Sequence, residues 1–224
     1  MRPTAKWLIV TADDFGISRG VNRGIVEAHR DGILTSTSLM VNRPAAEEAG
    51  ALSRQCPVLS VGLHLELDAT HCDDVSAELE RQLARFTALT GASPTHIDSH
   101  HDVHRDPRVS PHVRAWARRV GAPVRGYSDV RHLSKFYGQW GGESHLEQIG
   151  VDGLLRLVDT ELEDGEHVTE LTCHPGYIDP DLVSSYAAER EAELRTLCDP
   201  HVREALAERN IHLIGFRELL EDAA

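Results

Sequence analysis

Short apolar runs alternate along the chain with segments in which apolar residues recur at helical spacing. The apolar runs predict strands at about residues 6–13, 34–41, 59–67, 94–100, 122–127, 168–174 and 211–215. The helical patterns predict helices at about 19–30, 44–55, 75–89, 111–120, 154–162, 182–197 and 202–209. This alternation is typical of an α/β protein whose parallel strands are joined by right-handed crossovers.

The predicted strands, about seven in number, fit either an irregular (β/α) barrel or an open doubly wound sheet. No repeat, low-complexity tract or linker rich in Pro, Gly and Ser divides the 224 residues, so we predict a single domain over residues 1–224. In both folds the active site lies at the carboxyl ends of the strands. If the strands are assigned correctly, acids and histidines that take part in catalysis should lie at those carboxyl ends.

Acids and histidines gather at the predicted carboxyl ends of four strands. Asp13 and Asp14 end the first strand, and His64 lies in the third. His100 ends the fourth strand, and His174 ends the sixth. A random scatter of polar residues would not favour one rim of the sheet, so we expect the chemistry to take place there.

The segment THIDSHHDVH carries the strongest indication of a metal site. His96, Asp98, His100, Asp102 and His104 alternate along it, so a fully extended chain would place all five on one face. Imidazole is the commonest metal ligand in proteins, and carboxylates often orient ligating histidines. The alternative is a polar edge strand exposed to solvent.

Two adjacent acids follow the apolar run 7–10. Asp13 and Asp14 would repel each other and resist burial at the end of a core strand. One acid could stabilise the N-terminus of the next helix through its dipole. Two acids are more than that role requires, and a divalent cation would relieve their repulsion.

His64 and His174 are each open to two interpretations. Leucines flank His64 on both sides, which suits a hydrogen-bonded core histidine as well as a metal ligand. His174 precedes Pro175 and Gly176, so it either caps a turn or presents its imidazole as an acid or electrostatic stabiliser. Strand alternation points the adjacent Cys173 the other way, into the core.

Weaker features complete the candidate site. Asn42 could hydrogen-bond a substrate or form an ordinary turn before a proline. Residues 129–142 mix aromatic and polar residues with two glycines, and they form either a loop over the site or a plain connection. The Glu- and Arg-rich stretch 187–195 is most simply the solvated face of a helix.

Composition narrows the classes of function. The formal net charge of −13 argues against a nucleic acid or an anionic membrane surface as partner. No stretch reaches the roughly 18 unbroken apolar residues of a membrane span, and the N-terminus does not resemble a signal peptide, so we expect a cytoplasmic protein. None of the four cysteines forms a CxxC pair, which argues against a zinc knuckle or a redox motif.

Five motifs taken in order resemble the signatures of the YdjC-like carbohydrate deacetylases. They are TADDFGIS, TSTSLMVN, VGLHLEL, PTHIDSHHDVH and TCHPGY. The resemblance runs from about Leu8 to Tyr177, and the segments IHLIGF and FRELL fit the C-terminal part of the family. It implies an irregular (β/α) barrel related to the polysaccharide deacetylases, and removal of N-acetyl groups from a small amino sugar, oligosaccharide or glycoconjugate.

The resemblance also implies a role for individual residues. Asp14, His64 and His100 would ligate one divalent metal ion, with Mg²⁺ or Zn²⁺ as first candidates and Ni²⁺, Co²⁺ or Mn²⁺ as further ones. Asp13 would be the general base toward the attacking water, and His174 the general acid toward the departing amine. Substrate contacts, or contacts that orient the ligands, are expected from Asn42, Asp98 and His104.

The sequence departs from the family pattern at two places. Asp102 stands where the family often has a third histidine, and the segment between His64 and His96 is short for the family. The short segment predicts a more open cleft or a smaller substrate. The expected partner is a small carbohydrate, and a homodimer is left open. Rival functions are an O-acetyl esterase or phosphoesterase on the same barrel, or a sugar-binding protein without catalysis.

Overall fold

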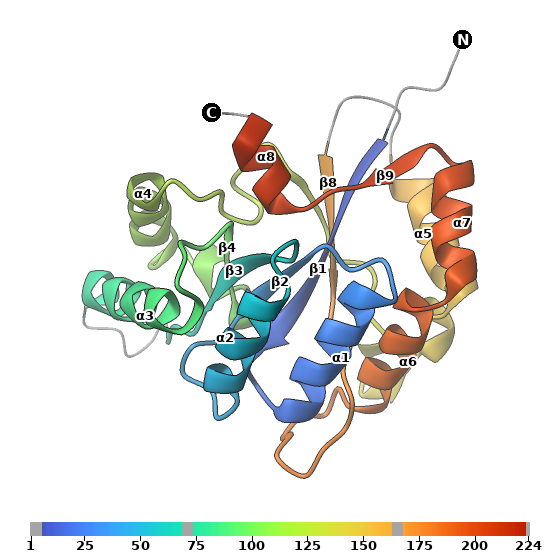
Figure 1. Cartoon of the computed structure of the whole chain (residues 1–224), viewed down its shortest axis with the longest axis horizontal. Coiled ribbons are helices and arrows are strands. Elements are labelled where there is room, and N and C mark those ends of the chain that lie inside the picture. The colour runs from blue at the N-terminus through green and yellow to red at the C-terminus, as the bar shows by residue number, and fades with distance from the viewer. Residues whose placement is uncertain (1–5, 69–73, 163–167, 223–224) are drawn as a thin grey trace.

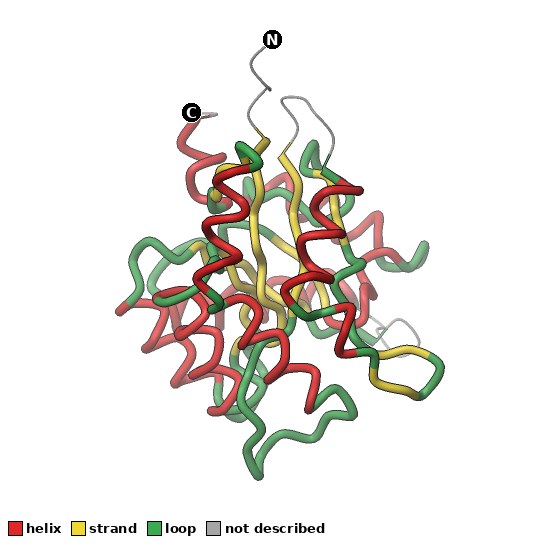
Figure 2. Tube along the Cα trace, turned by 90° about the vertical axis from the view of Figure 1, so that its right-hand side faces the viewer, coloured by secondary structure: helices red, strands yellow, loops and turns green. Residues whose placement is uncertain are grey.

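A computed structural model of the chain describes residues 6–68, 74–162 and 168–222. The N-terminal residues 1–5 and Cys72, which entered the sequence argument, lie outside the described residues. A sheet occupies the centre of the molecule and helices surround it (Figure 1). Figure 2 shows the strands running side by side within this layer of helices. Among the described residues, no helix combines the length and the apolar character that crossing a membrane requires.

The central sheet has the strand order β4-β3-β2-β1-β8-β5, with β9 paired to the first residues of β1. Each of its ladders is parallel, which confirms the predicted α/β class. Its strands are β1 (Lys6–Phe15), β2 (Ser36–Leu39), β3 (Ser60–Leu65), β4 (Ile97–Ser99), β5 (Arg131–Leu133), β8 (Val168–Cys173) and β9 (Ile211–Leu213).

Helices connect the strands and cover the outside of the sheet (Figure 1). They are α1 (Arg19–Arg30), α2 (Ala46–Gln55), α3 (Val75–Thr90), α4 (Ser110–Val120), α5 (Val151–Glu161), α6 (Ala188–Leu197), α7 (Pro200–Glu208) and α8 (Phe216–Asp222). α1 has the predicted bounds, because Ser18 caps it by accepting a hydrogen bond from the Val21 amide and its apolar face packs into the core.

The predicted irregular barrel is present as an open barrel. The segment predicted as a strand at 122–127 is reduced to a single bridge between Val124 and Ile97. Pro123 has no amide to donate, and Gly126 turns the chain with a φ of 73°, so the pairing ends at once. Within the described residues no ladder joins this segment to β5, which leaves the barrel open on that side.

The segment 129–142, expected to be a loop over the site or a plain connection, is not wholly irregular. This segment contains β5 and the start of a hairpin, β6 (Gln139–Trp140) with β7 (Glu143–Ser144). β5 is three residues long and Arg131 is exposed, so it has no apolar pattern that the sequence could reveal. Its pairing with β8 creates the strand.

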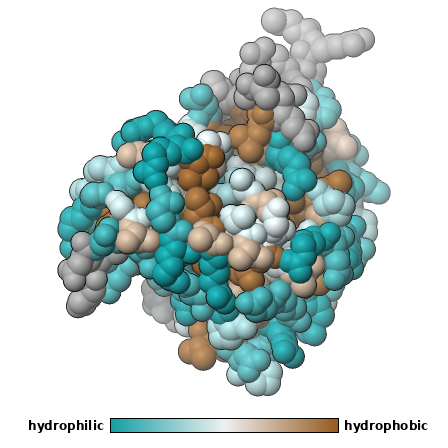
Figure 3. Space-filling model, turned by 60° about the vertical axis from the view of Figure 1, so that its left-hand side comes forward, coloured by the Kyte–Doolittle hydropathy of each residue, from teal (hydrophilic) through white to brown (hydrophobic). Residues whose placement is uncertain are grey.

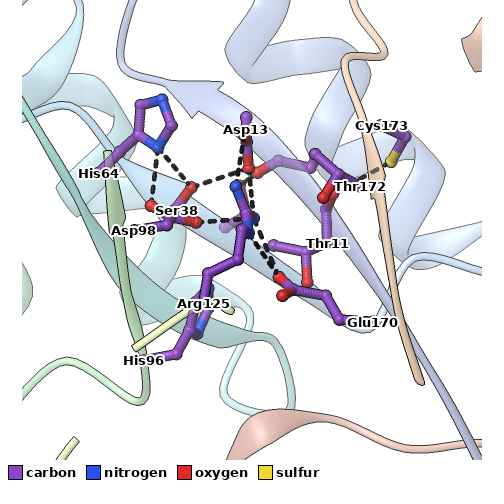
Figure 4. Close-up of polar contacts among 12 residues, drawn as sticks. Thr11, Asp13, Ser38, His64, His96, Asp98, Arg125, Glu170, Thr172 and Cys173 are labelled. Atoms are coloured by element: carbon purple, nitrogen blue, oxygen red, sulfur yellow. Dashed lines mark hydrogen bonds and ion pairs between the residues drawn. The ribbon is translucent and has the colours of Figure 1, made fainter. Parts of the chain in front are cut away.

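Alternate residues of the strands face two different environments. Leu8, Val10 and Ala12 of β1 belong to the apolar core that lies under the helices. Thr11 and Asp13 face the barrel interior, where polar side chains of neighbouring strands gather (Figure 4). The outer surface of one face is mainly hydrophilic with a smaller apolar area (Figure 3), in keeping with the acidic composition. The interior of the barrel is therefore lined by polar side chains, and the apolar core lies between the sheet and the helices.

Candidate metal centre and active site

A cleft opens at the carboxyl ends of the strands, as the α/β fold predicts. Residues from β1, β3 and β8 line it, together with residues of the segments that follow β4 and β5 and of α6. Its lining includes Asp13, Asp14, His64, His100, Arg125, Tyr137, His174, Ser184, Ser185, Tyr186 and Arg190.

The end of β1 is irregular, and this irregularity lets two adjacent acids face one cleft. The pairing of β1 with β2 shifts register between Ala12 and Phe15. Asp14 has a φ of 68°, in the left-handed region, and Gly16 follows with a φ of 98°. On a regular strand, neighbouring side chains point to opposite faces. The bulge turns Asp14 back toward the side on which Asp13 lies, and both line the cleft.

Three side chains bring one ligand atom each to a common point: Asp14, His64 and His100. Their ligand atoms lie within 4.8 Å of one another. Asp14 Oδ1 is 3.6 Å from His64 Nε2 and 3.3 Å from His100 Nδ1. This buried oxygen makes no hydrogen bond within the described part of the chain, so it is free to ligate a cation. Two imidazole nitrogens and one carboxylate oxygen suit a divalent metal ion.

Asp14 is held as an anion. Burial would raise the pKa of its carboxyl, but the contact with His100 and the charge of Arg190 hold that pKa well below its ordinary value. Arg190 Nη2 lies 2.5 Å from Asp14 Oδ2 and leaves Oδ1 for the cation. The carboxylate is therefore ionised and oriented before any metal binds.

Asp98 and Ser38 orient His64. Asp98 Oδ1 lies 2.7 Å from His64 Nδ1, and Ser38 Oγ lies 3.1 Å from the same nitrogen. A proton on Nδ1 that is donated to Asp98 leaves Nε2 as the ligating atom. Burial lowers the pKa of His64, but Asp98 and Asp13 outweigh it and raise that pKa to about 9. The same negative charges favour a metal cation at Nε2.

Arg125 is the centre of a buried network of charges that joins three strands (Figure 4). Its two terminal nitrogens contact the two oxygens of Asp13, both at 2.8 Å. Nη2 also lies 2.7 Å from Asp98 Oδ2 and 2.9 Å from Glu170 Oε1. Burial alone would raise the pKa of Asp13, but Arg125 lowers it below its ordinary value. Asp13 is thus a fixed, ionised carboxylate beside the candidate metal centre.

The sequence analysis did not identify Arg125 or Glu170. An arginine in the predicted strand 122–127, next to apolar residues, is the signal that could have pointed to a buried partner. Glu170 likewise lies among the predicted strand residues 168–174 and is 1% exposed. A charge in a buried strand requires a partner of opposite sign, and these two residues provide it for each other.

Two further groups of acids and histidines share this interior. Asp13, His64 and Asp98 form one, and His96, Asp98 and Glu170 form the other. Arg125 contacts both groups and already supplies a positive charge to their carboxylates. The group containing Asp14 is the one whose ligand oxygen lacks a hydrogen bond and faces the cleft, so it fits a cation best.

His174 also lines the cleft and follows β8 directly. Its backbone amide donates to Glu193, and Arg190 Nη1 lies 3.4 Å from its carbonyl oxygen. Its Nδ1 is buried and has no hydrogen-bond partner in the described ranges. Burial lowers the pKa of the imidazole, against the opposing effect of Asp13 and Asp14. The side chain can exchange a proton with a molecule in the cleft.

The expectation that 96–104 is one extended polar face was wrong. β4 ends at Ser99, and the chain continues as a 3₁₀ segment, His100–Arg105, with a φ of 55° at both His101 and Asp102. His100 reaches the candidate metal centre, whereas Asp102 is exposed at the rim of the cleft. The turn explains how neighbouring histidines come to have different environments.

The remaining predicted site residues have different positions. His104 is buried; its Nδ1 lies 2.7 Å from Ser99 Oγ and its Nε2 lies 3.1 Å from the Arg125 carbonyl oxygen. It supports the turn that carries His100 and does not line the cleft. Asn42 is exposed, accepts a hydrogen bond from Arg81 at 3.2 Å, and is also absent from the cleft lining.

The prediction of a solvated helix at 187–195 was wrong. Glu189, Arg190 and Glu193 of α6 are 1%, 3% and 0% exposed. Arg190 pairs with Asp14, and Glu193 accepts hydrogen bonds from Tyr186 and from the His174 amide. Glu193 follows Glu189 by four positions and Arg190 by three, and residues at these spacings are neighbours on a helix surface, so this charged face of α6 is the buried one.

A protein family and two curated proteins match the chain over most of its length. The family model described as YdjC-like protein matches residues 7–71 and 68–208. The chain is 37% identical to a carbohydrate deacetylase of Geobacillus stearothermophilus over 95% of this chain and 98% of that protein. It is 36% identical to a chitooligosaccharide deacetylase of Serratia marcescens over 96% of this chain and 99% of that protein.

Solved structures support the barrel. A protein of Enterococcus faecalis V583, proposed in its description to cleave cellobiose phosphate, superposes with a TM-score of 0.82 at 28% identity, covering 96% of this chain and 99% of that one. A family 4 acetyl xylan esterase of Clostridium thermocellum, solved with a cobalt ion, gives a TM-score of 0.59 at 13% identity over 96% and 91% of the two chains. The second similarity concerns the fold alone.

Proposed function

The chain belongs to the YdjC-like protein family, and from this membership we propose that it is a metal-dependent deacetylase acting on carbohydrates. Its substrate is an N-acetylated amino sugar, a short oligosaccharide of such sugars or a glycoconjugate. The products are acetate and the free amine. A small carbohydrate as partner and a cytoplasmic location belong to the same proposal.

One observation carries the proposal: Asp14, His64 and His100 converge at the rim that also presents Asp13 and His174. The first three provide a donor set for a cation. The last two provide a carboxylate and an imidazole that can accept and donate protons. A purely sugar-binding protein would not need these two groups beside a cation site.

The residues divide the hydrolysis between them. A divalent cation held by Asp14, His64 and His100 would polarise the acetyl carbonyl and lower the pKa of a neighbouring water. Asp13, kept ionised by Arg125, accepts the proton of the attacking water. His174 gives a proton to the departing amine; burial lowers the pKa of its imidazole, and Asp13 and Asp14 oppose that shift in part.

The donor set bears on the identity of the cation. Two imidazoles and one carboxylate suit Zn²⁺, Ni²⁺, Co²⁺ or Mn²⁺, whereas Mg²⁺ prefers oxygen ligands. The donors therefore favour Zn²⁺ over Mg²⁺ as the ion that binds most tightly. Mg²⁺ remains a candidate, because metal supply as well as affinity decides which ion a site holds.

The paired state of the arginines argues against a phosphate ester as substrate. Two buried arginines line the cleft, Arg125 and Arg190. Arg125 contacts Asp13, Asp98 and Glu170, and Arg190 contacts Asp14. Because acids of the protein already neutralise these guanidinium groups, they are not available to bind a phosphate.

Acetate release tests the proposal. The purified protein is stripped with a chelator, reloaded with one metal at a time, and offered N-acetylated and O-acetylated sugars. We expect acetate from the N-acetylated sugars only after reloading. Acetate from O-acetylated sugars alone would indicate an esterase. Saturable sugar binding without release of acetate by any reloaded form would indicate a binding protein.

A further inference from the structure

Two stacked tyrosines form one wall of the cleft next to His174. The rings of Tyr137 and Tyr186 are nearly parallel, 4.6 Å between centroids and 9° between planes. Tyr186 is 5% exposed, whereas Tyr137 is 38% exposed. Both rings meet the His174 ring edge-on, at 5.9 Å from Tyr137 and 5.6 Å from Tyr186. Tyr186 therefore covers one face of Tyr137 and leaves the other open.

The surrounding structure fixes this wall. The Tyr186 hydroxyl donates to Glu193 and accepts from the Gly138 amide at 2.9 Å. A Cβ on Gly138 would lie 2.6 Å from Ile149 Cδ1, so the chain beside Tyr137 packs closely against Ile149. A ring that is already immobilised loses little entropy when a ligand covers it. Tyr137 is therefore prepared to bind a flat apolar surface.

The proposed function places such a surface beside Tyr137. His174 delivers its proton to the nitrogen that leaves with the sugar, so the sugar ring lies on the His174 side of the reacting carbonyl. The Tyr137 ring packs edge-on against His174 and so lies next to the place expected for the sugar ring. The C–H groups of a pyranose ring carry partial positive charge, and the face of an aromatic ring is negative.

Building on that function, we propose that the open face of Tyr137 binds the pyranose ring that carries the departing amine. The acetyl group then points toward Asp14, His64 and His100, and the sugar stacks on the wall beyond His174. Ser184 and Ser185 line the same cleft and offer hydroxyl groups to the sugar. This site selects substrates in which a ring is joined directly to the amide nitrogen.

Substitutions at Tyr137 test the proposal with the N-acetylglucosamine disaccharide as probe. Tyr137→Leu removes the ring and keeps an apolar side chain, and Tyr137→Phe keeps the ring. Tyr127→Leu serves as the matched control, because Tyr127 is 40% exposed and does not line the cleft. Each variant is first checked for an unchanged unfolding midpoint and unchanged metal content.

We expect Tyr137→Leu to raise KM about tenfold with kcat changed less than about twofold, because stacking binds substrate and transition state alike. Tyr137→Phe and Tyr127→Leu should stay within about twofold of the wild type. Calorimetric titration of the disaccharide into an Asp13→Asn background should show the same roughly tenfold weakening for Tyr137→Leu.

The outcomes separate this site from the function on which it rests. Turnover by the wild type with an unchanged KM in Tyr137→Leu would overturn the sugar site and leave the deacetylase intact. A tenfold rise in KM for Tyr137→Phe as well would also overturn it, since the ring is retained there. Absence of turnover by the metal-loaded wild type would overturn the function and this site together.

Discussion

Glu193 makes the stability of the fold depend on pH in a way that one substitution can remove. The side chain is 0% exposed on α6 and accepts hydrogen bonds from Tyr186 and the His174 amide. Burial penalises its charged form more than these donors favour it, which raises the pKa of Glu193 from 4.5 to about 8. The folded protein therefore holds a proton that the unfolded chain releases.

The sign and size of the effect follow from this difference. Between pH 4.5 and about 8 the folded state binds one more proton at Glu193 than the unfolded state. The free energy of unfolding thus falls by about 1.4 kcal/mol for each unit by which the pH rises in that window. Integrated from about pH 5 to about pH 9, Glu193 removes about 4 kcal/mol of stability. Below about pH 4.5 the unfolding free energy no longer depends on pH through Glu193, because this side chain is protonated in both the folded and the unfolded state.

Denaturant unfolding at a series of pH values measures this effect. The difference in unfolding free energy between the wild type and Glu193→Gln cancels the other titrating groups. Between about pH 5 and about pH 9, we expect the unfolding free energy of the wild type to fall by about 4 kcal/mol relative to that of Glu193→Gln. Glu204→Gln, at an exposed carboxylate of α7, is the matched control and should show no such shift. A pH-independent difference for Glu193→Gln would refute the reasoning.

Three other substitutions probe the metal centre and the base. Asp13→Asn should lower kcat by more than about 10²-fold and leave metal content unchanged by elemental analysis; retained activity would remove Asp13 from the mechanism. His100→Ala should lose the metal at the concentration that saturates the wild type, and a full complement would contradict its role as ligand. Arg190→Met removes the arginine partner of the buried Asp14, so it should lower the unfolding free energy by about 3–5 kcal/mol without metal and by less with it. An equal loss of unfolding free energy in the metal-free and the metal-loaded protein would show that no cation neutralises Asp14.

Local patterns were sufficient for the parts of the fold that bury apolar residues regularly. The bounds of α1 follow from Ser18 and from apolar residues at helical spacing, and β1 follows from its apolar run. The sequence also placed Asp14, His64 and His100 at strand ends, and the structure brings these three together. Their role as metal ligands stays a prediction.

The interior charges could not be predicted from local pattern. Arg190 and Glu193 form a polar stripe that looks like a solvated helix face, because sequence spacing does not reveal which face is buried. Arg125 contacts Asp13 across 112 positions of sequence, and nothing local signals that pairing. The turn at His101 depends on Ser99 and His104 holding each other, which only the folded chain arranges. The first two failures concern polar contacts between distant segments, and the third concerns a contact over five positions that forms only together with the turn.

Locating a bound metal ion tests the central claim most directly. Crystals of the protein loaded with Zn²⁺ or Co²⁺ can be measured with anomalous scattering at the absorption edge of the metal. We predict one strong peak in the cleft, about 2.0–2.2 Å from one oxygen of Asp14 and from one nitrogen each of His64 and His100. A peak at Asp13 and Asp98 instead, or acetate release by protein that holds no metal, would contradict the account.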